Sequence, residues 1–431
     1  MSELRTKSLV KSDEDWTFLD VSTHDYTHGF HLYPARMHPE IAKRLIAKYV
    51  SDTKKVVFDP FMGSGGVLVE ALLHGNNSVG IDVNPMAVLL SKVKTTPINA
   101  TSLHEEYERL ITKSKMDYEN GKSYNNTPKS INLKFWYKED VLAKLAILKH
   151  HIFNSSTKKD ITDFFKVCFS LASRKASNQR NSIYKIYRIN KNDLNNFKPD
   201  AFEYFAEICQ KNIQKMQQFS SEMKENDSRA FPLLGDTRNV LESFDKIDQS
   251  ILDDGKAHLV VTSPPYGDHQ TTVAYGQFSK HPGLWLELPE EQLCEVDKVG
   301  LGGRKKKDSR EFESPLLEST IKQVKENDSK RANDVYAYFY DLDMCLEQIS
   351  NSLKQGESHC CFVVANRTVR RVKIPTDEII VELGKKYSFR HKETIYRTIA
   401  NKAMSSKNAP ENIVNLAGET MTKESIVIWK Y

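Results

Sequence analysis

Hydrophobic and polar positions along this chain fall into blocks that predict strands and helices in turn. Short, continuous apolar runs bounded by turn residues are typical of strands that are buried on both faces of a sheet. Such runs, together with two later β-rich segments, predict strands at 56–58, 79–82, 231–234, 259–262, 360–365, 393–399 and 425–429.

Between these runs the apolar residues repeat with helical spacing. Residues 39–50 place Ile41, Leu45 and Ile46 on one face, and residues 331–354 carry a long apolar stripe that Gly356 terminates. Pro375 opens a further predicted helix through Leu383. Regular alternation of strands and helices predicts an α/β fold with a mainly parallel, doubly wound sheet.

Two polar stretches interrupt this alternation. Residues 101–227 are helix-rich and rich in Asn and Lys, and residues 267–330 contain many loop signals. We therefore expect segments 20–100 and 230–431 to form one discontinuous α/β domain, with 101–227 as a helical insertion and 267–330 as a second insertion.

A glycine turn follows the first predicted strand. Asp59-Pro60-Phe61-Met62-Gly63-Ser64-Gly65-Gly66 precedes a helix that Gly75 closes. Glycines let the backbone approach a ligand closely and point N–H groups toward it. The dinucleotide spacing Gly-x-Gly-x-x-Gly is absent, and Asp59 would repel a pyrophosphate but suit a cationic amino group. Asp82 ends the next strand, where a carboxylate commonly binds ribose hydroxyls.

A second turn, Ser263-Pro264-Pro265-Tyr266, follows the predicted strand 259–262. The two prolines fix φ and lack N–H donors, so their carbonyls face outward and the turn cannot become helical. Ser263 adds a short acceptor, and Tyr266 adds a flat face with a polar tip. The turn therefore forms a cradle for a planar group that bears an NH2.

Taken together, these residues resemble the amino-group DNA methyltransferases that use S-adenosylmethionine. Residues 59–65 match that family's cofactor loop, and residues 262–266 match its catalytic motif in the form common among cytosine-N4 enzymes. Residues 30–39 look like the family's additional cofactor-side segment. The resemblance covers most of 20–100 and 230–431, and it implies a Rossmann-like, seven-stranded catalytic domain whose antiparallel strand is 425–429.

The resemblance also implies roles for individual residues. The expected catalytic residues are Ser263, Pro264, Pro265 and Tyr266. The expected cofactor-binding residues are Tyr33, Arg36, Asp59, Pro60, Phe61, Gly63, Ser64, Gly65, Asp82 and Asp236, the last accepting from the adenine amino group. No metal site is expected.

The resemblance thus implies a site-specific DNA methyltransferase that acts on the exocyclic amine of a flipped base. It also implies the modification enzyme of a restriction–modification system, with a solitary methylase as the alternative. Adenine-N6 enzymes usually carry Asp or Asn where Ser263 stands, which favours cytosine N4. Adenine-N6 methylation, RNA amino-methylation and a non-catalytic nucleotide-binding protein stay open. Methylation at carbon 5 of cytosine requires a Pro-Cys nucleophile, and this chain contains no Pro-Cys dipeptide.

Composition limits the partners and the compartment. The 431 residues include 62 basic and 57 acidic side chains, a formal charge of +5 that permits but does not require nucleic acid. The six cysteines show no Cys-x-x-Cys pair, so we expect reduced core residues. No apolar run is long enough to span a membrane and no secretory signal is recognisable, so a cytoplasmic, nucleoid-associated protein is expected.

Double-stranded DNA is the expected partner, with a cognate restriction endonuclease as a possible functional partner. Insertion 101–227 is the candidate target-recognition region, and 267–330 is a candidate DNA-contacting loop. The candidate DNA-binding residues are Arg174, Arg180, Arg304, Lys305 and Lys306.

Overall fold

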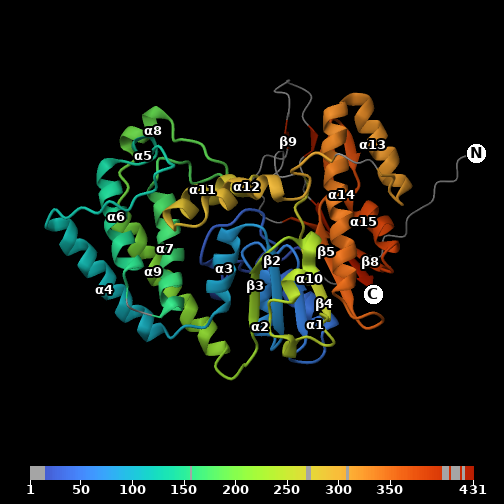
Figure 1. The fold of residues 1–431 in the computed structure, drawn as a ribbon, viewed down its shortest axis with the longest axis horizontal. Helices are drawn as coiled ribbons and strands as arrows, with labels where there is room; N and C mark the ends of the chain where they lie inside the picture. The colour runs from blue at the N-terminus through green and yellow to red at the C-terminus, as the bar shows by residue number, and fades with distance from the viewer. Residues whose placement is uncertain are drawn as a thin grey trace, which may run out of the picture.

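A seven-stranded sheet lies at the centre of the molecule (Figure 1). The computed structural model describes residues 15–155, 158–267, 273–306, 310–399, 407–408, 418–419 and 423–431. The sheet strands are β1 (Val56–Asp59), β2 (Asn77–Asp82), β3 (Ala230–Leu234), β4 (Leu259–Thr262), β5 (His359–Val364), β8 (Arg390–Thr398) and β11 (Lys423–Lys430).

The strand order is β3-β2-β1-β4-β5-β11-β8. The first five strands of this order pair in parallel, and β11 pairs antiparallel with both β5 and β8. The expected fold class is therefore confirmed, including the antiparallel strand near the end of the chain.

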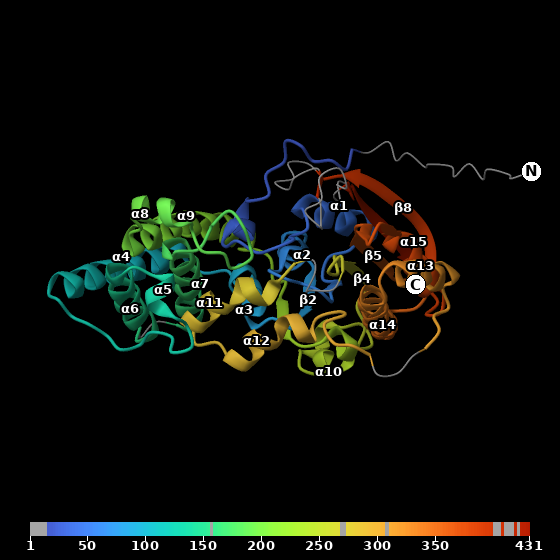
Figure 2. The ribbon, with the colours of Figure 1, turned by 90° about the horizontal axis from the view of Figure 1, so that it is seen from above.

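Helices cover both faces of this sheet, as the two-sided burial of its strands requires. Val57, Val261 and Cys361 pack toward α1 (Pro39–Tyr49) and α2 (Gly66–Leu73). Their neighbours Val260 and Phe362 point to the other face. That face is covered by α10 (Val240–Phe244), α13 (Pro315–Asn327), α14 (Ser329–Asn351) and α15 (Thr376–Lys385). Figure 2 shows α1 and α10 on opposite sides of the sheet.

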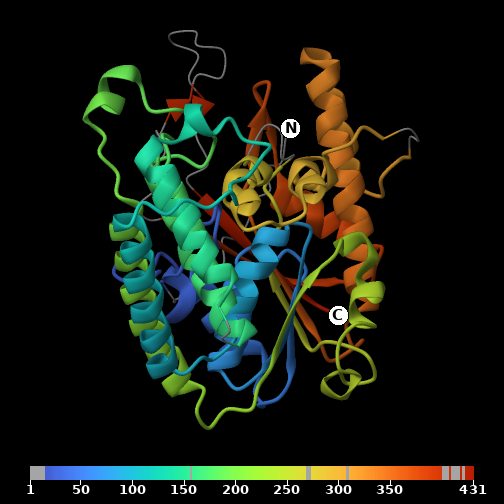
Figure 3. The ribbon, with the colours of Figure 1, turned by 60° about the vertical axis from the view of Figure 1, so that its left-hand side comes forward.

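The segment after α3 (Pro85–Thr95) forms a helical body beside the sheet (Figures 1 and 3). Its helices are α4 (Ala100–Glu119), α5 (Leu133–Trp136), α6 (Glu139–Phe153), α7 (Lys159–Ala176), α8 (Lys191–Asn196) and α9 (Ala201–Glu222). Phe164 and Phe205 share one buried cluster with Met86 and Leu90 of α3. The insertion is therefore packed onto the sheet domain through a continuous core.

Two helices cross the carboxyl end of the sheet, between the helical body and α14. They are α11 (Tyr275–Trp285) and α12 (Glu290–Val299), and Figure 1 shows them above β2 and β3. Short elements complete the described chain: η1 (Tyr26–Gly29), η2 (Thr237–Asn239), η3 (Gln249–Ile251), β6 (Arg367–Val369), β7 (Val372–Ile374), β9 (Lys407–Asn408) and β10 (Gly418–Glu419).

Three further properties concern the cysteines, metals and membranes. All six cysteines are free thiols, and Cys294 is the exposed one. Within the described ranges, no group of three or more His, Cys, Asp or Glu side chains has a metal-binding arrangement. In the same residues, no helix has the length and apolar character needed to cross a membrane.

Candidate functional site

The glycine turn and the double-proline turn lie side by side. They follow β1 and β4, which are parallel neighbours with Val57 opposite Leu259 and Phe58 opposite Val260. A buried hydrogen bond of 2.6 Å from Thr262 Oγ1 to Asp59 Oδ1 joins the two strand ends. Two motifs separated by about half of the chain therefore meet at one edge of the sheet.

A cavity of about 510 Å³ opens between these turns. Of the residues predicted from the sequence, its lining includes Tyr33, Arg36, Asp59, Pro60, Phe61, Gly63, Ser64, Asp82, Asp236, Ser263 and Pro265. The cavity thus brings the predicted cofactor segment, the glycine turn and the double-proline turn together. The lining does not include the predicted residues Gly65, Pro264 and Tyr266, each of which is next in the chain to a lining residue.

The glycine turn depends on backbone conformations that favour glycine. Gly63 has φ of 49° and Gly65 has φ of 76°, both in the left-handed region. A Cβ on Gly65 would lie 2.7 Å from Ser91 Oγ, so this glycine also permits close packing of α3. Gly63 N donates to Asp82 Oδ2 at 2.9 Å, which ties the turn to the end of β2.

Two carboxylates face this cavity, that of the buried Asp59 and that of the half-buried Asp82. Asp59 accepts from Thr262 and from Phe61 N, yet burial raises the pKa of its carboxyl to about 7. Burial likewise raises the pKa of Asp82 to about 6, against the backbone hydrogen bonds from Asn84 and Gly63. Both groups are thus set to gain from a ligand that presents a cation or hydroxyl donors.

The segment before α1 closes another wall of the cavity. Tyr33 packs against the glycine turn, since a Cβ on Gly63 would lie 3.2 Å from its Cε1 atom. Asn84 Nδ2 donates to Tyr33 Oη at 3.2 Å, which joins this ring to the N-cap of α3. Arg36 Nη1 donates to the His28 carbonyl at 2.8 Å.

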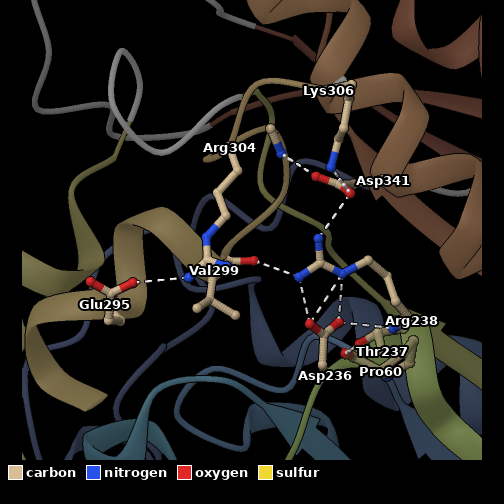
Figure 4. A network of polar contacts seen from close by, with 10 residues as sticks. Pro60, Asp236, Thr237, Arg238, Glu295, Val299, Arg304, Lys306 and Asp341 are labelled. Atoms are coloured by element: carbon tan, nitrogen blue, oxygen red, sulfur yellow. Dashed lines mark hydrogen bonds and ion pairs between the residues drawn. The ribbon is translucent and has the colours of Figure 1, made fainter. Parts of the chain in front are cut away.

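Asp236 has two structural tasks besides lining the cavity (Figure 4). Its Oδ1 accepts from Arg238 N at 2.9 Å and so caps η2, and its carboxylate also pairs with the Arg238 guanidinium. Arg238 donates in addition to Asp341 Oδ1 and to the Val299 carbonyl, each at 2.8 Å. This network holds the loop after α12 against the end of the cavity that Asp236 lines.

The double-proline turn is braced by groups from distant strands and helices. Ser263 Oγ donates to the Val363 carbonyl at 3.0 Å and lies 3.3 Å from Tyr266 Oη, and a hydroxyl oxygen that donates can still accept. Tyr338 Oη donates to the Pro265 carbonyl at 2.6 Å, and Tyr266 Oη donates to Glu424 Oε1 at 2.8 Å. Burial, and then the Glu424 charge, raise the pKa of Tyr266 well above its usual value, so its hydroxyl stays protonated.

The cavity lining also holds residues that were not predicted from the sequence, among them three with charged side chains: Lys94, Arg397 and Glu424. Arg397 and Glu424 form a buried ion pair across β8 and β11, beside Tyr266. In the sequence, each of these two residues is a charged position close to apolar strand positions. A buried ion pair can be inferred from them only when the pairing of β8 with β11 is known, because each charge has its partner on the other strand.

The predicted DNA-binding residues differ in their exposure, and two need correction. Arg174 is 2% exposed, donates to Gln179 and to the Ile183 carbonyl, and stacks on Phe278, so it faces the core rather than DNA. Lys306 pairs with the buried Asp341 carboxylate, so its charge is already neutralised.

The other three are on the surface. Arg180 and Lys305 are exposed, and Arg304 is exposed while paired with Glu295 (Figure 4). Lys307, which continues this basic run, lies outside the described residues.

An α/β sheet that brings a glycine turn, two strand-end carboxylates and a Ser-Pro-Pro-Tyr turn to one cavity defines the methyltransferase class. A family model described as DNA methylase, covering N6 and N4 methyltransferases, matches residues 3–93. The type II methyltransferase M.MvaI of Kocuria varians is 36% identical over 440 residues, covering 99% of this chain and 95% of that relative. The chain therefore belongs to the amino-methyltransferases of restriction–modification type.

Two further likenesses are more limited. The type II methyltransferase M.MjaII of Methanocaldococcus jannaschii is 30% identical over 116 residues, which cover 26% of this chain and 22% of that relative. The solved rRNA methyltransferase aviRa of Streptomyces viridochromogenes aligns over 93% of this chain and 88% of its own at 8% identity, with a TM-score of 0.31.

Proposed function

We propose that this protein transfers a methyl group from S-adenosylmethionine to the N4 amine of cytosine in double-stranded DNA, at a specific sequence. The observation that carries this proposal is the hydrogen bond between Thr262 and Asp59. It joins the strand end that suits the cofactor to the strand end that suits the base, so one cavity serves both.

The chemistry of the cavity wall fits S-adenosylmethionine. Asp59 is buried and acidic, and it would take the cationic amino end of the cofactor. Asp82 would accept from the ribose hydroxyls, with Tyr33 packed beside the glycine turn. Phe61, Pro60 and Asp236 would hold the adenine ring and its amino group.

When bound, the cofactor supplies a methyl group that its sulfonium has already activated. The task of the protein is therefore to orient the base amine, whose lone pair is delocalised into the ring. Ser263 Oγ and the Pro264 carbonyl would accept from the NH2 group, favour a pyramidal nitrogen and aim its lone pair into the cavity. Such orientation of two reactants supplies on the order of 7–11 kcal/mol of barrier reduction.

The base must leave the duplex to reach Ser263, because the turn stands at the wall of a cavity. Flipping costs a few kcal/mol, which contacts with Tyr266 and the cavity wall would offset. A short hydroxyl acceptor at Ser263, in place of the Asp or Asn usual in adenine-N6 enzymes, is the reason that we favour cytosine.

Within the helical insertion, the loop 180–188 is proposed to contact DNA. Tyr184, at the tip of the segment 180–188, lines the cavity and is 43% exposed. Tyr187 is also exposed, and Arg180 N donates to the Tyr187 carbonyl at 2.8 Å, so the loop has a defined shape. Aromatic faces interleaved with Arg180, Lys185 and Arg188 suit phosphates and unstacked bases.

Sequencing that detects modified bases in DNA from cells expressing the chain tests this proposal. We expect N4-methylcytosine within one sequence context, abolished by Ser263→Ala. N6-methyladenine in one context would overturn the choice of base and retain the DNA substrate. Methylation of RNA alone, or binding of NAD in preference to S-adenosylhomocysteine, would overturn the proposal as a whole.

The biological role proposed is protection of host DNA against an endonuclease with the same recognition sequence. DNA extracted from expressing cells should then resist cleavage by an endonuclease that cuts the same recognition sequence when it is unmethylated. DNA from cells that carry Ser263→Ala should be cut.

A further inference from the structure

Lys94 is a buried cation on the wall of the cavity. It lies in the last turn of α3, is 1% exposed, and its Nζ donates to Ser64 Oγ at 3.0 Å. Ser64 belongs to the glycine turn, so the ammonium group stands directly beside the predicted cofactor loop. Burial, and then the charges of Arg36 and Lys215, lower the pKa of Lys94 well below its usual value.

Arg36 is a second cation on the same wall. Its Nη1 donates to the His28 carbonyl, and burial lowers the pKa of its guanidinium. Glu70 of α2 is the nearby acidic side chain, and its Oε1 atom pairs with His28 Nε2 at 2.7 Å instead of with Arg36 or Lys94. Among the residues that the structure describes, neither Lys94 nor Arg36 has a carboxylate within ion-pair distance.

Two cations on one buried wall without a counter-ion are costly, because burial removes their hydration and their charges repel. Such a pair is retained when a ligand supplies the missing negative charge. Two carboxylates, Asp59 and Asp82, line the cavity at strand ends, while the third cation of the lining, Arg397, is already paired with Glu424. The cavity therefore separates its charges, with carboxylates at the strand ends and cations beside Ser64.

We propose that Lys94, with Arg36 and Ser64, forms an anion subsite that takes the α-carboxylate of the cofactor's methionine moiety. This inference rests on the proposed use of S-adenosylmethionine. The amino-acid end of that cofactor carries an ammonium and a carboxylate, and the cavity lining offers the Asp59 carboxylate to the first and the Lys94 ammonium to the second. Ser64 orients the Lys94 ammonium, and ligand binding supplies the carboxylate that the fold leaves out.

A DNA phosphate offers the same negative charge from another source. The depth of Lys94, at 1% exposed, favours the cofactor, because a backbone phosphate stays outside the cavity when a base is flipped into it. Removal of the Lys94 charge distinguishes the two sources. It should weaken the binding of a small cofactor analogue if the anion is the cofactor carboxylate, and the binding of DNA if the anion is a phosphate.

Calorimetric titration of the full-length protein with two ligands tests this inference. S-adenosylhomocysteine carries the amino-acid end, and 5′-methylthioadenosine lacks both its amine and its carboxylate. For Lys94→Met we expect S-adenosylhomocysteine to bind about 10- to 100-fold more weakly, as for loss of a hydrogen bond to a charged group. The affinity for 5′-methylthioadenosine should be unchanged or slightly improved.

Lys92→Met is the matched control. Lys92 lies on the same helix but pairs with Asp163 away from the cavity lining, so this variant should bind both ligands as the unmodified protein does. Arg36→Gln provides a second variant with the same expected selectivity, should Lys94→Met fold poorly by its thermal melting curve.

Each outcome has a distinct meaning. Equal weakening of both ligands in Lys94→Met and Arg36→Gln, or no weakening of either, overturns the subsite and leaves the proposed function intact. Weaker binding of duplex DNA with unchanged binding of S-adenosylhomocysteine assigns the cations to phosphate and also overturns the subsite. Failure of the unmodified protein to bind S-adenosylhomocysteine overturns the proposed function itself.

Discussion

The glycine turn and the double-proline turn lie on neighbouring strands but are stabilised in different ways. The glycine turn is held by its own backbone N–H groups: Gly65 N donates to Met62 O at 2.8 Å, and Met62 N donates to the carbonyl of Ile81 at 3.1 Å. Gly63 N also donates to the Asp82 carboxylate at the end of the adjacent strand at 2.9 Å. The prolines of the second turn have no N–H to donate. That turn is held instead by side-chain contacts that involve Val363, Tyr338 and Glu424.

The difference has a functional consequence. A turn held by its own backbone and by the adjacent strand should keep its ligand affinity when distant side chains change. A turn held by remote side chains should lose orientation when any one of them is removed. Measuring cofactor affinity and methyl-transfer rate separately therefore distinguishes the two turns.

The largest expected effect follows from Ser263→Ala. Losing the acceptor that orients the base amine should lower the methyl-transfer rate by about 100-fold, the cost of slight misplacement of reacting groups. Affinity for S-adenosylhomocysteine should not change, because Ser263 belongs to the second turn. Single-turnover kinetics with labelled cofactor measures the rate, and Ser319→Ala, an exposed serine on α13, is the control. A rate equal to that of the unmodified protein would remove Ser263 from the mechanism.

Asp59→Asn tests the first turn. We expect affinity for S-adenosylhomocysteine to fall about 10- to 100-fold, as for loss of a hydrogen-bonded charge. In the unmodified protein the pKa of Asp59 is raised to about 7, and the ionised form binds the ammonium. Affinity should therefore rise as the pH increases through about 7, and this rise should diminish in Asp59→Asn.

The stability of the folded protein should fall as the pH rises, whereas cofactor affinity should increase. A carboxyl whose pKa is raised from 3.8 to about 7 by burial destabilises the folded protein progressively as pH rises between those values. Asp59→Asn should therefore melt at a higher temperature than the unmodified protein at pH 8, with the difference shrinking toward pH 4. A lower melting temperature at pH 8 would mean that the hydrogen bond from Thr262 outweighs the burial cost.

Glu424→Gln tests the brace behind Tyr266. The substitution keeps an acceptor for the Tyr266 hydroxyl but removes the charge that pairs with Arg397. We expect about a tenfold lower methyl-transfer rate, comparable to loss of about 1.4 kcal/mol, with unchanged affinity for S-adenosylhomocysteine. Glu393→Gln, which removes a peripheral charge paired with Lys48, is the control. A cofactor-affinity loss equal to the rate loss would contradict the separation of the two turns.

The smallest effect is expected for Tyr338→Phe. It removes the 2.6 Å hydrogen bond to the Pro265 carbonyl and retains the ring in the core. The expected loss is about 1 kcal/mol, or a few-fold in rate, as for one neutral hydrogen bond. Rate and thermal stability, measured together, check this result. A rate loss as large as that of Ser263→Ala would mean that Tyr338 positions the base directly.

Several elements could be predicted accurately because their signals are local. The run 259–262 coincides with β4, where an apolar strand ends against two prolines. The predicted helix 331–354 is found at Ser329–Asn351, and it begins earlier because the Asp328 side chain accepts from Lys330 N and Arg331 N. An N-cap of this kind depends on the hydrogen bonds of one side chain, and apolar periodicity gives no information about them.

The charged residues were predicted less well, for a related reason. The sequence 173–180 has a composition that suits DNA, yet Arg174 is buried against Phe278, which follows it by about a hundred residues. No sequence feature distinguishes Lys94, because an isolated lysine on an apolar helix is usually a solvated side chain. Its burial is a result of how α3 packs on the glycine turn.

The sequence by itself determined the strand-helix alternation, the left-handed glycine turn and the rigid proline turn, because backbone conformation and apolar periodicity act over a few residues. Only the tertiary structure decided which charges are paired, which are buried without a partner and which of them share a cavity. Electrostatic free energy depends on distance and burial, and both are set by segments that are far apart in the chain. Three basic side chains therefore have three different roles: Arg174 is a core residue, Lys306 is an ion-pair partner and Lys94 is a proposed ligand contact.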